Sequence, residues 1–174
     1  MVNRKNLLPL VVLFLFLTSA VNAGTVNFVG SYSNVESGDE GEHCSGYDID
    51  LYEHEGSTIG NVSYSSGLCG DSPFGLLNEV KHEKKQGSLL FESKLSVGED
   101  AKGRTKDILK FKGVLTQSSL SGVMSWFTYG SNKPYSEEKV KVQKIEKGWV
   151  VKSLDFEEWK KSQQELLKFR GPKW

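Results

Sequence analysis

The sequence has few of the residues from which catalytic and metal-binding motifs are built. Its 174 residues include only three histidines, two cysteines and four prolines. We find no nucleophile elbow, zinc-binding helix, phosphate loop or dinucleotide fingerprint. His43, His54 and His82 share no motif, so a metal site would require the fold to bring them together. We therefore expect no enzyme activity, no metal and no cofactor.

The sequence also lacks a large net charge. Lysine and arginine number 22, as do aspartate and glutamate. This balance argues against a nucleic-acid partner, because dedicated nucleic-acid binders carry a strong basic excess. The distribution is uneven, since Gly24–Val80 contains acidic residues but no lysine or arginine, whereas Lys81–Trp174 is basic overall. The two halves either balance each other in the folded domain or create a field that steers a charged partner.

Long hydrophobic runs are absent except near the start. Two basic residues precede the apolar stretch Leu7–Leu17, which is shorter than the roughly 20 residues of a transmembrane helix. Val21 and Ala23 are the small residues that precede a cleavage site. This pattern predicts a signal peptide over residues 1–23 and a periplasmic or secreted product without an integral membrane segment. An uncleaved anchor is the alternative.

The predicted compartment determines the expected state of the two cysteines. An even number of cysteines in an oxidising compartment predicts a disulfide between Cys44 and Cys69. It would close a loop of about 26 residues, and chain entropy gives such a bridge roughly 3–4 kcal/mol. The alternative is a reactive thiol beside His43.

Segments of alternating polar and apolar residues make up most of residues 24–152. Their period of two is typical of half-buried strands, and in the first segment Val26, Phe28 and Tyr32 are expected to share one face. About eight strands in meander order close most simply as an antiparallel barrel, which removes exposed edges. The predicted strands are Thr25–Ser33, Gly46–Glu53, Thr58–Ser65, Gly75–Glu83, Ser88–Val97, Asp107–Thr116, Leu120–Tyr129 and Glu138–Ile145.

The period changes to that of a helix within residues 153–174. Asp155 is an expected N-cap, and Gly171-Pro172 is an expected stop. We expect a helix over Phe156–Phe169, which packs on the barrel through Phe156, Trp159 and Leu166. A helix that binds a partner or a membrane surface is the alternative.

This plan resembles that of the lipocalin and avidin group. The tripeptide Gly30-Ser31-Tyr32 stands where lipocalins carry Gly-x-Trp, with Tyr in place of Trp. The second lipocalin motif, near strands six and seven, is not evident. The resemblance implies a mainly β fold, a small barrel of about eight strands with one C-terminal helix, and transfers no residue roles.

These features predict an exported, non-catalytic β-barrel binding protein. A small eight-stranded barrel either fills its interior or holds one small ligand. If the interior is hollow, a small apolar ligand would contact inward-facing aromatic residues, namely Phe28, Tyr47, Phe91, Phe111 and Trp126. The alternative is a module for a protein partner, such as a periplasmic enzyme inhibitor or an immunity-type protein. The uneven charge and the acidic segment Glu36–Glu42 favour that alternative.

One pair of carboxylates carries a further hypothesis. Asp48 and Asp50 are two residues apart, so they share one face of a strand. Such a pair could serve acid–base chemistry or bind Ca²⁺. On a solvent-facing wall it would instead be ordinary polar exterior.

Overall fold

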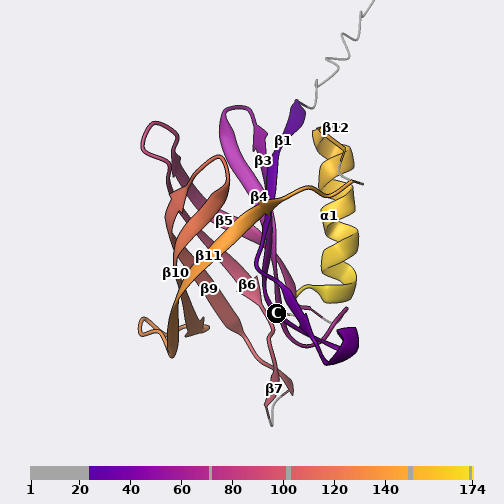
Figure 1. Ribbon diagram of the computed structural model, residues 1–174, viewed down its shortest axis with the longest axis vertical. Coiled ribbons are helices and arrows are strands. Elements are labelled where there is room, and N and C mark those ends of the chain that lie inside the picture. Colours follow the sequence, from indigo (N-terminus) through magenta and orange to yellow (C-terminus); the bar gives the residue numbers. More distant parts are fainter. Residues whose placement is uncertain (1–23, 71, 101–102, 149–150, 173) are drawn as a thin grey trace, which may run out of the picture.

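A computed structural model describes residues 24–70, 72–100, 103–148, 151–172 and 174. The predicted signal peptide, residues 1–23, lies outside the described residues. The described residues form a closed eight-stranded antiparallel β-barrel with one C-terminal helix, which confirms the predicted fold class (Figure 1). The barrel strands are β1 (Thr25–Ser33), β3 (His43–His54), β4 (Ser57–Leu68), β5 (Phe74–Glu83), β6 (Ser88–Leu95), β9 (Asp107–Leu115), β10 (Ser119–Thr128) and β11 (Ser136–Ile145).

Shorter elements occupy segments that were expected to be irregular. β2 (Glu36–Gly38) and the 3₁₀ turn η1 (Asp39–Gly41) follow β1, and β7 (Glu99–Asp100) pairs with β8 (Gly103–Arg104) in a small hairpin. β12 (Ser153–Asp155) pairs with the start of β1, immediately before the helix. The helix therefore begins from a strand that is part of the sheet.

The barrel has two distinct ends. The β5–β6 and β9–β10 hairpins lie at one end, which we call the mouth end (Figure 1). The opposite end carries Cys44 and Cys69, and we call it the disulfide end. Closure between the first and last barrel strands is short, since Ser31–Ser33 of β1 pairs with Gln143–Ile145 of β11 at three positions.

Side chains fill the interior. A single cluster of buried apolar residues runs through it, and the Phe91 and Phe111 rings stack there with centroids 5.1 Å apart. Gly113 of β9 pairs with Gly122 of β10 beside the Phe111 ring. A Cβ atom on Gly113 would lie 2.4 Å from Phe111 Cζ, so only glycine leaves room for the ring here.

A β-bulge in β1 changes which face each half of the strand presents. Phe28 pairs with Tyr52 and Gly30 pairs with Leu51, so Val29 is an extra residue without an opposite partner. Before the bulge, Val26 and Phe28 lie outside the barrel wall; after it, Tyr32 lies inside. The expectation that all three share one face is therefore wrong.

The helix α1 (Phe156–Arg170) lies along the outside of the barrel beside β1 and β5 (Figure 1). Asp155 caps it, because its Oδ1 accepts a hydrogen bond from the Glu157 amide at 2.8 Å. Trp159 joins a second buried cluster with Val26 and Tyr52. Among the described residues, no helix is both long enough and apolar enough to cross a bilayer.

The face that α1 turns to the wall differs partly from the predicted one. Trp159 is buried and Phe156 half-buried, as expected, but Leu166 is exposed and Gln163 is buried in its place. The Gln163 side-chain oxygen accepts a hydrogen bond from Asn61 of β4 at 2.9 Å. An apolar stripe could not reveal this polar contact, because the partner lies on a distant strand.

Cys44 and Cys69 form the predicted disulfide. Their Cα atoms lie 4.9 Å apart, at the disulfide-end termini of the paired strands β3 and β4. The bridge therefore reinforces the start of one hairpin strand against the end of the other, and its presence suggests an oxidising environment.

We expect the double substitution Cys44→Ser/Cys69→Ser to lower the free energy of unfolding by about 3 kcal/mol, because the unfolded chain regains the entropy that the bridge removes. Urea denaturation of the oxidised proteins measures this difference. The double substitution Ser45→Ala/Ser66→Ala, at an adjacent exposed cross-strand pair, is the control and should change little. Equal stability of the cysteine variant and the wild type would contradict the expectation.

Candidate functional site

The structure brings together four of the five aromatic residues expected to line a ligand cavity. Tyr47, Phe91, Phe111 and Trp126 all belong to the interior cluster and are at most 4% exposed. Their rings pack against each other and against aliphatic side chains. Phe28 lies outside the wall, with its ring centroid 5.5 Å from that of Tyr52, because the bulge in β1 intervenes.

Near the disulfide end, the interior cluster becomes polar. The Trp126 indole Nε1 donates a hydrogen bond to the Tyr47 hydroxyl at 2.9 Å, and that hydroxyl donates to the Glu138 carboxylate. The Tyr64 ring packs against both Tyr47 and Trp126. Burial and the Glu138 carboxylate raise the pKa of Tyr47, so its hydroxyl stays protonated and holds this network together.

At the mouth end, a pocket of about 500 Å³ opens to solvent between the hairpins and β1. It lies in the size range of small-ligand sites, and mouths of β-barrels are common places for such sites. Three of its lining residues are lysines and none is acidic. The pocket, which we call the mouth pocket, is lined by Val29, Tyr32, Lys84, Lys85, Gln86, Gly87, Val114, Leu115, Thr116, Gln117 and Lys144.

Backbone contacts fix the two hairpins that form the rim of the mouth pocket. The Leu115 amide donates a hydrogen bond to the Gly87 carbonyl at 2.7 Å. Gly87 has a φ of +69°, and a Cβ atom there would lie 2.5 Å from the Leu115 carbonyl oxygen. Glycine is therefore required at this position by both conformation and space, and the hydrogen bond links the two hairpins directly.

Sequence reasoning missed Lys144 as an inward-facing residue. It lies two residues after Val142, whose side chain is in the interior, so the period of two already places both on the same face. The Lys144 Nζ donates to the Val29 carbonyl at 3.1 Å and lies 6.0 Å from the Tyr32 ring centroid. The same alternation could have identified it from the sequence.

The two aspartates of β3 lie in a second pocket, between the barrel wall and α1. The Lys147 Nζ lies 2.9 Å from Asp48 Oδ1 and 2.9 Å from Asp50 Oδ1. Ser31 also donates a hydrogen bond to Asp50. The carboxylates are therefore neither open polar exterior nor a vacant cation site: a lysine that the sequence analysis did not identify bridges them.

Burial and neighbouring charges have opposite effects on the pKa values of this cluster. Burial raises the pKa of Asp48, although Lys147 acts in the opposite direction. Burial alone would lower the pKa of Lys147, but the hydrogen bonds and charges of Asp50 and Asp48 outweigh it and raise that pKa. The cluster is thus a mutually dependent ion-pair network that anchors the segment after β11 to β3.

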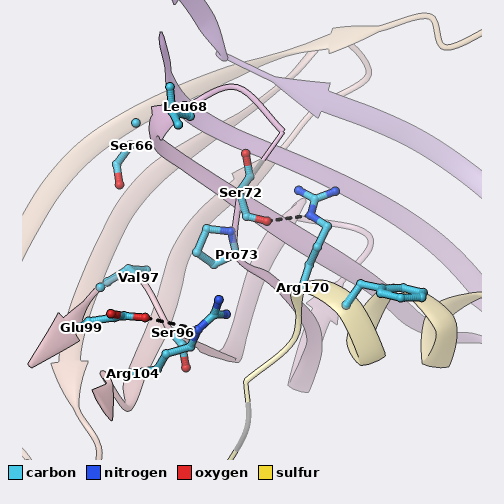
Figure 2. Close-up of a pocket in the computed structure, with 12 residues that line it drawn as sticks. Ser66, Leu68, Ser72, Pro73, Ser96, Val97, Glu99, Arg104 and Arg170 are labelled. Carbon is cyan, nitrogen blue, oxygen red and sulfur yellow. Dashed lines mark hydrogen bonds and ion pairs between the residues drawn. The ribbon is translucent and has the colours of Figure 1, made fainter. Parts of the chain in front are cut away.

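A third pocket, of about 340 Å³, lies at the disulfide end between the last turn of α1, the β4–β5 loop and the β7–β8 hairpin. Figure 2 shows the Arg170 side chain reaching the Ser72 carbonyl, which accepts a hydrogen bond from Nε at 2.7 Å. Arg104 lies on the other side of Pro73, near Glu99 (Figure 2). Leu68 and Phe169 also line the pocket and are 60% and 74% exposed.

The histidines do not come together. Within the described part of the chain, no group of three or more His, Cys, Asp or Glu side chains is placed to hold a metal ion. His82 instead shares a hydrogen bond with the Thr58 hydroxyl at 2.9 Å, between β5 and β4. This contact is a link between two barrel strands.

No protein-family model matches the chain, and no curated protein or solved structure is significantly similar to it. The resemblance to lipocalins and avidins is therefore one of architecture alone. Functional roles for this barrel have to come from the chemistry of its own pockets.

Replacing Lys147 by methionine should lower the free energy of unfolding by about 2–3 kcal/mol at pH 7, because it leaves two carboxylates partly buried without their cation. Since burial raises the pKa of Asp48, the variant should regain stability as the pH falls from 7 towards 4 and the carboxylates become protonated. Urea denaturation over this pH range measures both effects.

The matched control is Lys141→Met, which removes the same charge from the exposed face of β11. It should change the free energy of unfolding by less than about 0.5 kcal/mol. Adding Asp50→Asn to Lys147→Met should restore part of the loss, and failure of this rescue would contradict the ion-pair interpretation.

Proposed function

We propose that this chain is an exported, non-catalytic β-barrel binding protein that takes its ligand at the mouth pocket. The leader pattern over residues 1–23 and the Cys44–Cys69 disulfide support export to the periplasm or the exterior of the cell. The filled interior leaves little support for a small apolar ligand inside the barrel, so the proposed ligand site moves to the open end.

The observation that carries this proposal is the contrast between the core and the mouth pocket. Core residues such as Leu89, Leu109 and Leu120 have no exposed surface, whereas the mouth pocket has a volume of about 500 Å³ and a fixed rim. Its lining combines the buried Tyr32 with polar side chains from both hairpins. The mouth pocket is wide open to solvent and its lining mixes polar and apolar groups, and the mouths of β-barrels are common places for ligand sites.

Native mass spectrometry of the mature protein, purified gently from its own compartment, tests this proposal. We expect a bound small molecule in the wild type and a much smaller bound fraction in Gln117→Trp, because the new indole occupies the mouth pocket. Gln164→Trp, at an exposed position of α1, is the matched control and should keep the ligand. A wild-type spectrum showing only the polypeptide, or equal occupancy in both variants, would contradict the proposal.

A second candidate function is protein–protein recognition at the pocket of Figure 2. Its specific support is the exposure of two large apolar side chains, Leu68 and Phe169, in a lining that also includes Arg104 and Arg170. Phenylalanine and arginine side chains are enriched in protein interfaces, and arginine is among the residues that contribute most of the binding energy. The partner that fits is a protein loop with an apolar side chain next to a carboxylate, as an inhibitor or immunity-type module would bind.

Photo-crosslinking distinguishes this second candidate. With p-benzoylphenylalanine in place of Phe169, one defined protein from the same compartment should be captured, and Arg170→Gln should reduce the yield several-fold by removing the carboxylate contact. The same photo-reactive residue in place of Lys161, an exposed position of α1, should capture much less. Equal capture from both positions would indicate non-specific contact and overturn the candidate.

A further inference from the structure

The mouth pocket is a cluster of hydrogen-bond donors. Its lining includes the ammonium groups of Lys84, Lys85 and Lys144 and no aspartate or glutamate. Lys84 forms an ion pair at 2.8 Å with Glu53, a residue that does not line the pocket. The positive charge of the pocket therefore comes from Lys85 and Lys144, and no carboxylate in the lining offsets it. Donors that converge without an acceptor of opposite charge favour an anion.

Tyr32 provides a neutral donor at the floor of this pocket. Its side chain is 1% exposed, and none of the described residues forms a hydrogen bond with its hydroxyl. Gly30 lies nearer the mouth end of β1 than Tyr32 does. A Cβ atom on Gly30 would lie 3.2 Å from Tyr32 Cε2, so the Tyr32 ring extends towards the mouth end. Burial raises the pKa of Tyr32, so the hydroxyl remains protonated and can donate.

Lys144, an exposed residue on β11, lies over the Tyr32 ring with donor capacity to spare. One ammonium hydrogen bonds to the Val29 carbonyl, and the ammonium lies over the Tyr32 ring. A lysine ammonium has three donors, so two remain for a ligand. A Cβ atom on Gly30 would lie 2.8 Å from Lys144 Cε, so a larger residue there would shift the end of this lysine side chain.

We infer that the mouth pocket binds an oxyanion, namely a phosphate, sulfate or carboxylate group on a small solute or on a lipid headgroup. The Tyr32 hydroxyl and the Lys144 ammonium bind the anionic oxygens at the floor. Lys85, on the β5–β6 hairpin, adds a charge at the rim, and Val114 and Leu115 contact an apolar part of the same ligand. This inference rests on the proposed function, because it names the ligand class of the same pocket.

An NMR titration of the mature protein with inorganic phosphate, sulfate and acetate, at constant ionic strength in chloride, tests the inference. We expect saturable amide shifts at Gly87, Leu115 and Thr116 with at least one anion. Tyr32→Phe and Lys144→Gln should each weaken that binding by about tenfold, the usual effect of losing a hydrogen bond to a charged group. Lys85→Gln, on the exposed rim, provides a variant that does not disturb the core and should weaken binding several-fold.

Lys141→Gln is the matched control, because it removes one charge from the same strand, β11, outside the pocket. It should leave the affinity within about twofold of the wild type, since a distant surface charge is screened by salt. Equal weakening by Lys141→Gln and Lys144→Gln would indicate general surface attraction and overturn the inference. Absence of saturable shifts with all three anions would overturn it as well.

A further arm identifies the source of the oxyanion. We measure co-sedimentation with phosphatidylglycerol and with phosphatidylcholine vesicles. Binding to phosphatidylglycerol vesicles alone, together with weaker binding of Lys144→Gln, would assign the site to a lipid headgroup. Phosphate or sulfate binding without vesicle binding would assign it to a free solute. If native mass spectrometry shows a ligand that Gln117→Trp removes but no oxyanion binds, the proposed function stands and this inference fails.

Discussion

The extra residue in β1 determines how both cores of the molecule are built. Before Val29, the strand places Val26 and Phe28 against α1; after it, the strand places Tyr32 inside the barrel. In a strand without a bulge, Val26, Phe28 and Tyr32 would all point to the same face, because even numbers of residues separate them. Gly30, immediately after the bulge, also leaves the space in which Lys144 and the Tyr32 ring meet. The helix, the interior and the mouth pocket thus depend on one local irregularity.

The two ends of the interior differ in charge. On β11, Glu138 and Lys144 flank the inward-facing Val140 and Val142, so one strand carries a carboxylate to one end of the barrel and an ammonium to the other. The carboxylate is already engaged by the Tyr47 hydroxyl, whereas the ammonium donates to the Val29 carbonyl alone among the described residues and has two further donors. This difference is the reason for which we propose the mouth end, rather than the disulfide end, as the site of a small anionic ligand.

The sequence was sufficient for the elements that local periodicity specifies. Alternation predicted the eight barrel strands, and the Asp155 cap and the Gly171-Pro172 stop predicted the limits of α1. It was insufficient where distant segments determine the outcome. The bulge that turns Phe28 outward depends on pairing with β3, and the Gln163 contact depends on β4.

The pockets were beyond the reach of sequence analysis for the same reason. Lys147 meets Asp48 and Asp50 only because the chain after β11 returns to β3. The mouth pocket likewise combines residues from both hairpins and from β1. The filled interior could not be predicted either, because period-two patterns give the direction of side chains but not how completely they occupy the enclosed volume.

The short pairing between β1 and β11 has a mechanical consequence. Main-chain pairing joins these strands at three positions, and beyond them none of the described strands pairs with the free edge of β11. Tyr47, Trp126 and Glu138 span the remaining gap through their side chains. Exposed Lys139 and Lys141 accompany this edge, and such charges discourage the addition of a foreign strand. Closure of the barrel at this end therefore depends on aromatic and carboxylate side chains rather than on main-chain hydrogen bonds.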